Sequence, residues 1–195
     1  MILTDREIQV FLANRQINIK PKPDPVRYSS TSVDLTLAKQ LRIWSFDQIE
    51  KTKGEIVTPG PEFKYSEFRE KFTKRINIRP DKGYVLAPDA FILAWTHETI
   101  YLPNHSRIAA RVEGKSSLAR LGLAVHVTAP TIHAGFEGPL QLELCNHGPV
   151  SIRLTPGMPI CQLIFEMTLG TPAKGYSGIF LRQKNSYYKV EQGRN

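Results

Sequence analysis

Short runs in which apolar and polar residues alternate recur along the chain, a pattern typical of β-strands with one buried face. From residue 83 onward these runs follow one another at intervals of about ten residues. We predict strands at 33–37, 84–87, 91–96, 108–112, 124–128, 140–144, 150–154 and 160–165. Strands this short and evenly spaced, with turn residues between them, are typical of a β-sandwich or β-barrel.

Two other segments carry helical signals. Thr4 and Glu7 have the spacing of a capping box, and Ile8 and Phe11 follow at helical spacing. We therefore predict a helix close to the start of the chain. Residues 61–75 contain three phenylalanines among many charged residues, a pattern that fits either a surface helix or a long excursion.

A polar cluster stands at the start of a third, shorter helix. Ser116 is a suitable N-cap for a helix that runs through Leu121 and ends at Gly122. Lys115, Ser116 and Ser117 would then bring a cation, two hydroxyls and free backbone N–H groups together, an arrangement suited to phosphate. An ordinary capped turn on a protein surface fits the same residues.

Glu143 is a sharper candidate for chemistry. On the predicted strand 140–144 one face is formed by leucines, and the other by Gln141, Glu143 and Cys145. A face exposed to solvent is expected to carry more charge, so this one is expected to line a semi-buried site. A carboxylate there is suited to general acid/base catalysis, although a solvated strand glutamate gives the same pattern. Arg120 is one candidate partner for it.

The length and composition favour a single domain over residues 1–195. The chain has 41% hydrophobic residues, enough for one well-buried core. It has no apolar run of about 20 residues that could span a membrane, and its polar start is unlike a signal peptide. We therefore expect a cytoplasmic protein. Cys145 and Cys161 lie in apolar, strand-like segments, where we expect buried free thiols and no metal site.

The net charge of +8 and the pI near 9.6 indicate an anionic partner, and both a nucleic acid and a nucleotide satisfy this. Residues 171–195 carry five Lys or Arg against one Glu, interleaved with aromatic residues. Such a tail fits a segment that closes over a triphosphate, and it also fits a solvated chain end.

The run Ser-Ser-Leu-Ala-Arg-Leu-Gly-Leu at 116–123, followed by Val-His-Val-Thr-Ala at 125–129, resembles the signature of bacterial dCTP deaminases. The resemblance extends to 1–8, 32–35, 154–158 and 134–138, the last of which is similar to a motif shared with trimeric dUTPases. It implies a mainly β fold, a distorted jelly-roll β-barrel of the dUTPase-like type with a few short helices. It also implies a homotrimer with active sites between subunits.

The resemblance assigns the chemistry to protein groups alone, without zinc. The His-x-Glu and Pro-Cys-x-x-Cys motifs of zinc-dependent deaminases do not occur in this sequence. By analogy with the family, Glu143 takes a proton from a water held by the Ser116 hydroxyl and the Ala129 carbonyl, and that water attacks C4 of cytosine. Arg120 would stabilise the charges that develop.

The resemblance also implies a set of substrate contacts. Lys115 and Ser117 would hold phosphates, with Mg²⁺ bridging the triphosphate oxygens, and the tail 171–195 would fold over the nucleotide. A dTTP feedback inhibitor is a further implied partner. The complete set of substrate-binding residues is Lys115, Ser117, Leu118, Ala119, Val127, Thr128, His133, Phe136, Gln141, Leu142, Tyr176, Lys189 and Gln192.

Three residues depart from the family pattern. His133 stands where the family has an aspartate that contacts the sugar 3′-hydroxyl and, in members that also cleave dUTP, helps to activate water. Near a triphosphate a histidine is favoured in its cationic form and is then a poor base. Lys115 replaces the usual arginine, so a compact ammonium group stands where the family has a planar guanidinium with several hydrogen-bond donors. Pro130 would stiffen the loop that carries Ala129.

We therefore expect a cytoplasmic, homotrimeric enzyme that converts dCTP to dUTP and ammonia. A bifunctional enzyme that releases dUMP and pyrophosphate is an alternative, weakened by His133. A plain dUTPase would leave Glu143 without a chemical task. A nucleotide-binding or nucleic-acid-binding protein that has lost catalysis would also explain the charge and the altered motif, although a nucleic-acid partner is the less expected of the two.

Overall fold

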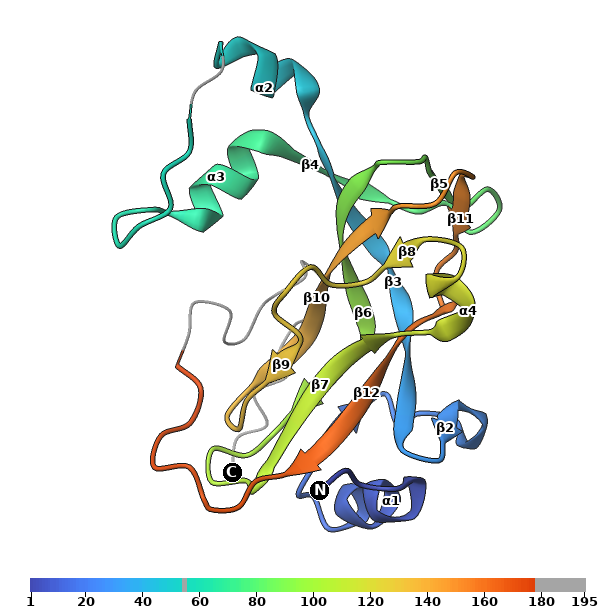
Figure 1. Cartoon of the computed structure of the whole chain (residues 1–195), viewed down its shortest axis with the longest axis vertical. Coiled ribbons are helices and arrows are strands. Elements are labelled where there is room, and N and C mark those ends of the chain that lie inside the picture. Colours follow the sequence, from blue (N-terminus) through green and yellow to red (C-terminus); the bar gives the residue numbers. More distant parts are fainter. Residues whose placement is uncertain (54–55, 178–195) are drawn as a thin grey trace, which may run out of the picture.

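The computed structural model describes residues 1–53 and 56–177, and its main element is one strongly curled, half-barrel sheet (Figure 1). The strands are β1 Asn18–Lys20, β2 Tyr28–Ser29, β3 Ser32–Trp44, β4 Thr73–Asn77, β5 Tyr84–Leu86, β6 Phe91–Tyr101, β7 Ile108–Gly114, β8 Leu123–Ala124, β9 Thr131–Ile132, β10 Glu137–Asn146, β11 Ile152–Leu154 and β12 Pro159–Met167. The helices are α1 Asp5–Ala13, the 3₁₀ turn η1 Pro25–Arg27, α2 Phe46–Lys51, α3 Tyr65–Phe72 and α4 Ser116–Ala119.

The main sheet has the strand order β8-β10-β6-β3-β12-β7-β9, with β1 added to β6, and β2 and β4 added to β3. All of these neighbours pair antiparallel, and β5 and β11 form a separate two-stranded sheet. The curl encloses one continuous apolar core, in which Leu35, Leu41, Leu144 and Phe165 are completely buried. The predicted mainly β architecture is therefore confirmed.

Most predicted strands are present, and the central ones are longer than predicted because their pairing continues past the alternating run. The prediction for 124–128 is wrong beyond Ala124, where β8 ends. Val127 and Thr128 are exposed, and the Val127 N–H donates to the Glu143 carboxylate instead of a neighbouring strand. The strand predicted at 150–154 is likewise shorter, since only β11 pairs with β5.

The N-terminal helix and its capping box are confirmed: Thr4 N–H donates to Glu7 Oε2 at 2.9 Å. Residues 61–75 include the helix α3, which settles the choice left open by the sequence. Ser116, however, is not an N-cap. The Lys115 carbonyl accepts from the backbone N–H groups of residues 118 and 119, so Lys115 is the N-cap and Ser116 is the first helical residue.

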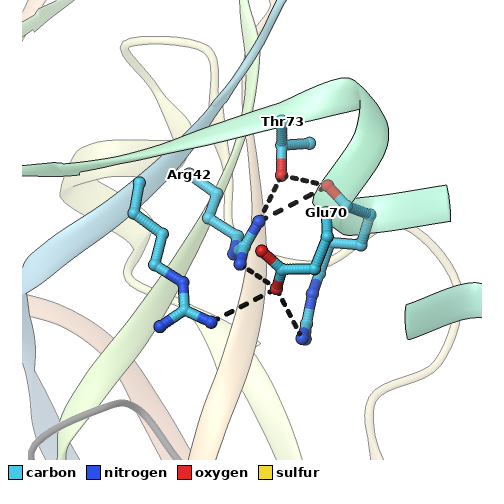
Figure 2. Close-up of polar contacts among 5 residues, drawn as sticks. Arg42, Glu70 and Thr73 are labelled. Carbon is cyan, nitrogen blue, oxygen red and sulfur yellow. Dashed lines mark hydrogen bonds and ion pairs between the residues drawn. The ribbon is translucent and has the colours of Figure 1, made fainter. Parts of the chain in front are cut away.

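α2 and α3 project from one end of the curled sheet, and an ion pair between a buried arginine and a half-exposed glutamate ties α3 to it (Figures 1 and 2). The Arg42 side chain on β3 is 1% exposed and is ion-paired with Glu70 of α3. Arg42 Nη1 donates to Thr73 Oγ1 at 2.7 Å. Glu70 also pairs with Arg69 at 3.3 Å and with Arg75 at 3.2 Å. Because Arg42 is buried, losing Glu70 would leave its charge without a counter-ion.

We predict a pH effect from this ion pair. Hydrogen bonds from Arg42 and Arg75 lower the pKa of Glu70 from 4.5 to about 2, against a smaller opposing effect of burial. A carboxyl whose pKa is lowered by folding stabilises the protein above its unfolded pKa, and this stabilisation is lost as the pH falls toward the folded value. The melting temperature should therefore fall more steeply in the native protein than in Glu70→Gln between about pH 5 and about pH 3.

The matched control is Glu67→Gln on the same helix, because Glu67 forms only an exposed pair with Lys64. Its melting temperature should follow that of the native protein across the same pH range. Equal acid sensitivity in Glu70→Gln and the native protein would show that the Arg42 pair does not stabilise the fold.

Candidate active site

The side-chain alternation along β10 builds one wall of a pocket. Leu140, Leu142 and Leu144 are buried, whereas Gln141 and Glu143 are half-buried on the opposite face. The pocket has a volume of about 530 Å³. It is lined by Trp44, Tyr65, Phe91, Leu93, Val112, Ala129, Pro130, Thr131, Ile132, His133, Phe136, Leu140, Gln141, Glu143 and Tyr176.

Glu143 is the carboxylate of this pocket. Its Oε2 accepts a hydrogen bond of 3.3 Å from the backbone N–H of Val127, in the irregular segment between β8 and β9. The same segment contributes Ala129 and Pro130 to the lining. Burial raises the pKa of the adjacent Cys145 thiol, and the negative charge of Glu143 raises it further. The loop thus places a backbone N–H directly beside the carboxylate.

Aromatic residues form a second wall, which the sequence motifs did not indicate. Trp44 at the end of β3 and Phe91 at the start of β6 stack with ring centroids 6.0 Å apart. Tyr65 reaches the pocket from α3, and its side chain is hydrogen-bonded to that of Gln141. Burial raises the pKa of the Tyr65 phenol. Only the aromatic spacing within 61–75 hinted at this wall, and it did not reveal what the rings face.

The start of the C-terminal segment returns to the same pocket. The Tyr176 backbone N–H donates to the Ala134 carbonyl at 2.7 Å. The Tyr176 ring stacks on His133 with centroids 6.0 Å apart and lies 6.2 Å from the ring of Phe136. The predicted contacts His133, Phe136 and Tyr176 are thus brought together. Lys189 and Gln192, also predicted to contact the ligand, lie outside the described residues.

The residues predicted on α4 do not reach this pocket within one chain. Ser116, Ser117, Ala119 and Arg120 are exposed, and no ion pair joins Arg120 to Glu143 in the part of the chain that the structure describes. Leu118 packs against the core instead.

Other predicted contacts also lie outside the lining. Lys115 is engaged elsewhere, since its Nζ pairs with Asp34 Oδ2 at 2.5 Å. Leu142 is buried in the core, so only its backbone could face a ligand. Val127 and Thr128 are exposed, and Val127 reaches Glu143 only through its backbone N–H.

Within residues 1–53 and 56–177, no group of three or more His, Cys, Asp or Glu side chains could hold a metal ion. Both cysteines are free, and Cys161 is completely buried. No helix in these ranges has the length and apolar character needed to cross a membrane.

The arrangement suits acid/base chemistry on a small planar ligand. The volume and the largely apolar, aromatic lining are those of a small-molecule pocket. Glu143 and Gln141, two residues apart on the same strand face, contribute polar groups to this lining. A carboxylate placed in this way can take a proton from a water molecule and return it to a bound heterocycle.

Comparison with known proteins identifies relatives over most of the chain. The sequence model of dCTP deaminase-like proteins matches residues 2–168. A dCTP deaminase from Tolumonas auensis is 37% identical over 194 residues, which cover 99% of this chain and 95% of the relative. A dUMP-forming dCTP deaminase from Beutenbergia cavernae is 38% identical over 174 residues, which cover 89% of this chain and 83% of the relative.

A solved structure shows the same fold. The 2′-deoxycytidine 5′-triphosphate deaminase from Agrobacterium tumefaciens matches with a TM-score of 0.64 and 23% sequence identity. The match covers 85% of this chain and 48% of that protein, so this chain spans about half of its length. The jelly-roll fold that the sequence resemblance implied is thereby confirmed.

We predict that Gly135 is required for the Tyr176 side of the pocket. Its φ of +90° disfavours other residues, and an added Cβ would lie 2.5 Å from Asn104 Oδ1 and 2.6 Å from Tyr176 N. Gly135→Ala should lower the free energy of unfolding by about 2–4 kcal/mol, measured by thermal or urea denaturation.

Gly157→Ala is the matched control, because Gly157 has a similar φ of +80° with no atom within 4 Å of an added Cβ. This substitution should lower the free energy of unfolding by only about 1 kcal/mol, which is the part of the effect that comes from the backbone conformation. Equal losses in the two variants would mean that the close approach of Tyr176 to Gly135 contributes nothing.

Proposed function

This chain belongs to the dCTP deaminase-like family, and we propose that it catalyses the hydrolytic deamination of dCTP to dUTP and ammonia. The observation that carries the proposal is the half-buried Glu143 carboxylate in a pocket with aromatic walls. Such a pocket accepts a pyrimidine ring, and the carboxylate supplies the acid/base group that deamination needs.

In this mechanism a water molecule attacks C4 of cytosine while its proton passes to the Glu143 carboxylate. The new C4–O bond gives a tetrahedral intermediate, and Glu143 delivers the proton to N3. Glu143 then moves the hydroxyl proton to the amino group, the C4–N bond breaks, and ammonia leaves as the C4 carbonyl forms. The backbone N–H of Val127 holds the carboxylate in place throughout.

The groups that complete the site come from a neighbouring subunit of a homotrimer. Ala129 lines the Glu143 pocket and offers its carbonyl to the attacking water, but Ser116 and Arg120 are exposed on α4. Their exposure leaves them available to a second copy of the chain. There the Ser116 hydroxyl would hold the water, and Arg120 would stabilise the negative charge that develops.

The triphosphate is bound as its Mg²⁺ complex, with the metal held through phosphate oxygens. Ser117 contacts the phosphates on the exposed face of α4. Lys115 can join it only by leaving Asp34. Tyr176 and the segment after it close over the nucleotide, and dTTP binds the same pocket as an inhibitor. We place the enzyme in the cytoplasm.

A second candidate activity is release of dUMP and pyrophosphate from the same site. Its support is the similarity to relatives such as the dUMP-forming enzyme of Beutenbergia cavernae. His133 weighs against it, because it stands where the resemblance implies an aspartate that helps to activate the hydrolytic water.

The first functional prediction concerns Glu143. Glu143→Gln should reduce ammonia release from dCTP by about 10²–10⁴-fold, because the amide cannot accept the water proton. Binding should survive, and dCTP should still raise the melting temperature of the variant. Glu137→Gln, the same change on the same strand but outside the pocket lining, is the control. Near-native turnover by Glu143→Gln would remove this residue from the mechanism.

The second prediction separates the two candidate activities. The unmodified protein should convert dCTP, in the presence of Mg²⁺, to dUTP with little dUMP or pyrophosphate. Chromatography of the nucleotides and a pyrophosphate assay measure these products. His133→Asp should keep the fold and increase pyrophosphate release, because a carboxylate can orient and deprotonate water. Stoichiometric pyrophosphate from the unmodified protein would favour the bifunctional activity instead.

A further inference from the structure

Three arginine side chains converge on one carboxylate oxygen where α3 meets the sheet (Figure 2). Glu70 Oε1 is ion-paired with Arg42, and it lies 3.3 Å from Arg69 Nη2 and 3.2 Å from Arg75 Nη2. The arginines come from β3, α3 and β4, so the packing of three elements builds the cluster. None of these four residues lines the pocket of Glu143.

The cluster carries more positive charge than its carboxylate balances. Three guanidinium charges against one carboxylate charge leave a net charge of +2. In the part of the chain that the structure describes, no second carboxylate pairs with these arginines. Arg42 and Arg75 also stand directly opposite each other in the β3–β4 register, where like charges repel. An anion between them offsets this repulsion, and a single carboxylate does so only in part.

One side of the cluster is buried and the other is open to solvent. The Arg42 side chain is 1% exposed, whereas those of Arg75 and Glu70 are 45% and 52% exposed. Arg69 Nε is buried and has no hydrogen-bond partner among the described residues, which is unfavourable for an N–H donor. An anion can therefore enter beside Glu70, and this half-exposed carboxylate can turn out into water.

We propose that Arg42, Arg69 and Arg75 form a binding site for a phosphate dianion, and that Glu70 occupies this site in the free protein. Planar guanidinium groups suit phosphate, which offers each of them an acceptor oxygen, whereas one oxygen of Glu70 now serves all three. A dianion balances two of the three positive charges, where the carboxylate balances one. The dianion is inorganic phosphate or the terminal phosphate of a small ester, which share this chemistry.

The test measures binding of inorganic phosphate by calorimetry, at constant ionic strength and at about pH 8, where phosphate is mainly a dianion. Glu70→Gln should bind phosphate about tenfold more tightly than the native protein, because the competing carboxylate is gone. Arg75→Gln should bind it about tenfold more weakly, the loss expected for one charge-assisted hydrogen bond. The rise in melting temperature that phosphate causes should follow the same order.

Lys74→Gln is the matched control for Arg75→Gln. It removes one positive charge from the adjacent position of β4, where Lys74 pairs with Asp47 at 3.8 Å and not with Glu70. Its phosphate affinity should equal that of the native protein. Melting temperatures without phosphate show that each variant is folded. If Glu70→Gln does not fold, the comparison of the native protein with Arg75→Gln and Lys74→Gln still decides the question.

Two results would overturn the inference. The first is equal phosphate affinity in the native protein, Glu70→Gln and Arg75→Gln, because phosphate bound elsewhere is insensitive to these changes. The second is an equal loss of affinity in Arg75→Gln and Lys74→Gln, which would show a general effect of charge. Methyl phosphate distinguishes the two sources of the dianion: binding in the same order as phosphate assigns the site to phosphate esters, and selective binding of inorganic phosphate assigns it to the free ion.

The inference does not rest on the proposed function, since the phosphate titration contains no dCTP. A protein that releases no ammonia from dCTP but shows the expected order of phosphate affinities would fail as a deaminase and keep this site. A protein that releases ammonia and binds phosphate equally in every variant would keep the deaminase activity and lose this site.

Discussion

The alternation of side chains along β10 is the constraint on which the rest of the structure depends. Its leucines are buried in the core, and the same pleat turns Gln141 and Glu143 toward the pocket. A register shift of one residue would exchange the two faces and place a carboxylate in the apolar core, at a large cost in free energy. The core thus holds the Glu143 carboxylate at a fixed position.

Two attachments outside the barrel complete the pocket around this strand. The Arg42–Glu70 ion pair holds α3 so that Tyr65 faces Gln141, and Tyr176 returns from the end of β12 to stack on His133. The curled sheet provides the frame, and the residues added around it determine the shape of the pocket. Ser116, Ser117 and Arg120, in and after α4, are exposed and lie outside the lining of this pocket.

Features that depend on local sequence could be predicted. The leucine alternation identified β10 and singled out Glu143, and the Thr4–Glu7 capping box identified α1. Features that depend on tertiary contacts could not be predicted. Val127 lies in a segment that reads as a strand, but its N–H donates to Glu143. The ion pair that ties α3 to the sheet joins Arg42 and Glu70, which are 28 residues apart in the sequence. The resemblance predicted that Ser116 and Arg120 serve the site of Glu143, but within one chain both are exposed and lie outside the lining of the pocket.

The central claim is that Glu143 of one subunit and α4 of another form each deamination site, and subunit mixing tests it most directly. Glu143→Gln and Arg120→Ala, each inactive alone, are unfolded together, refolded as mixed assemblies and assayed for ammonia release from dCTP. Sites shared between subunits should recover about one quarter of native activity, because one site in four combines the two intact contributions. Mixed assemblies that stay as inactive as the separate variants would contradict the account.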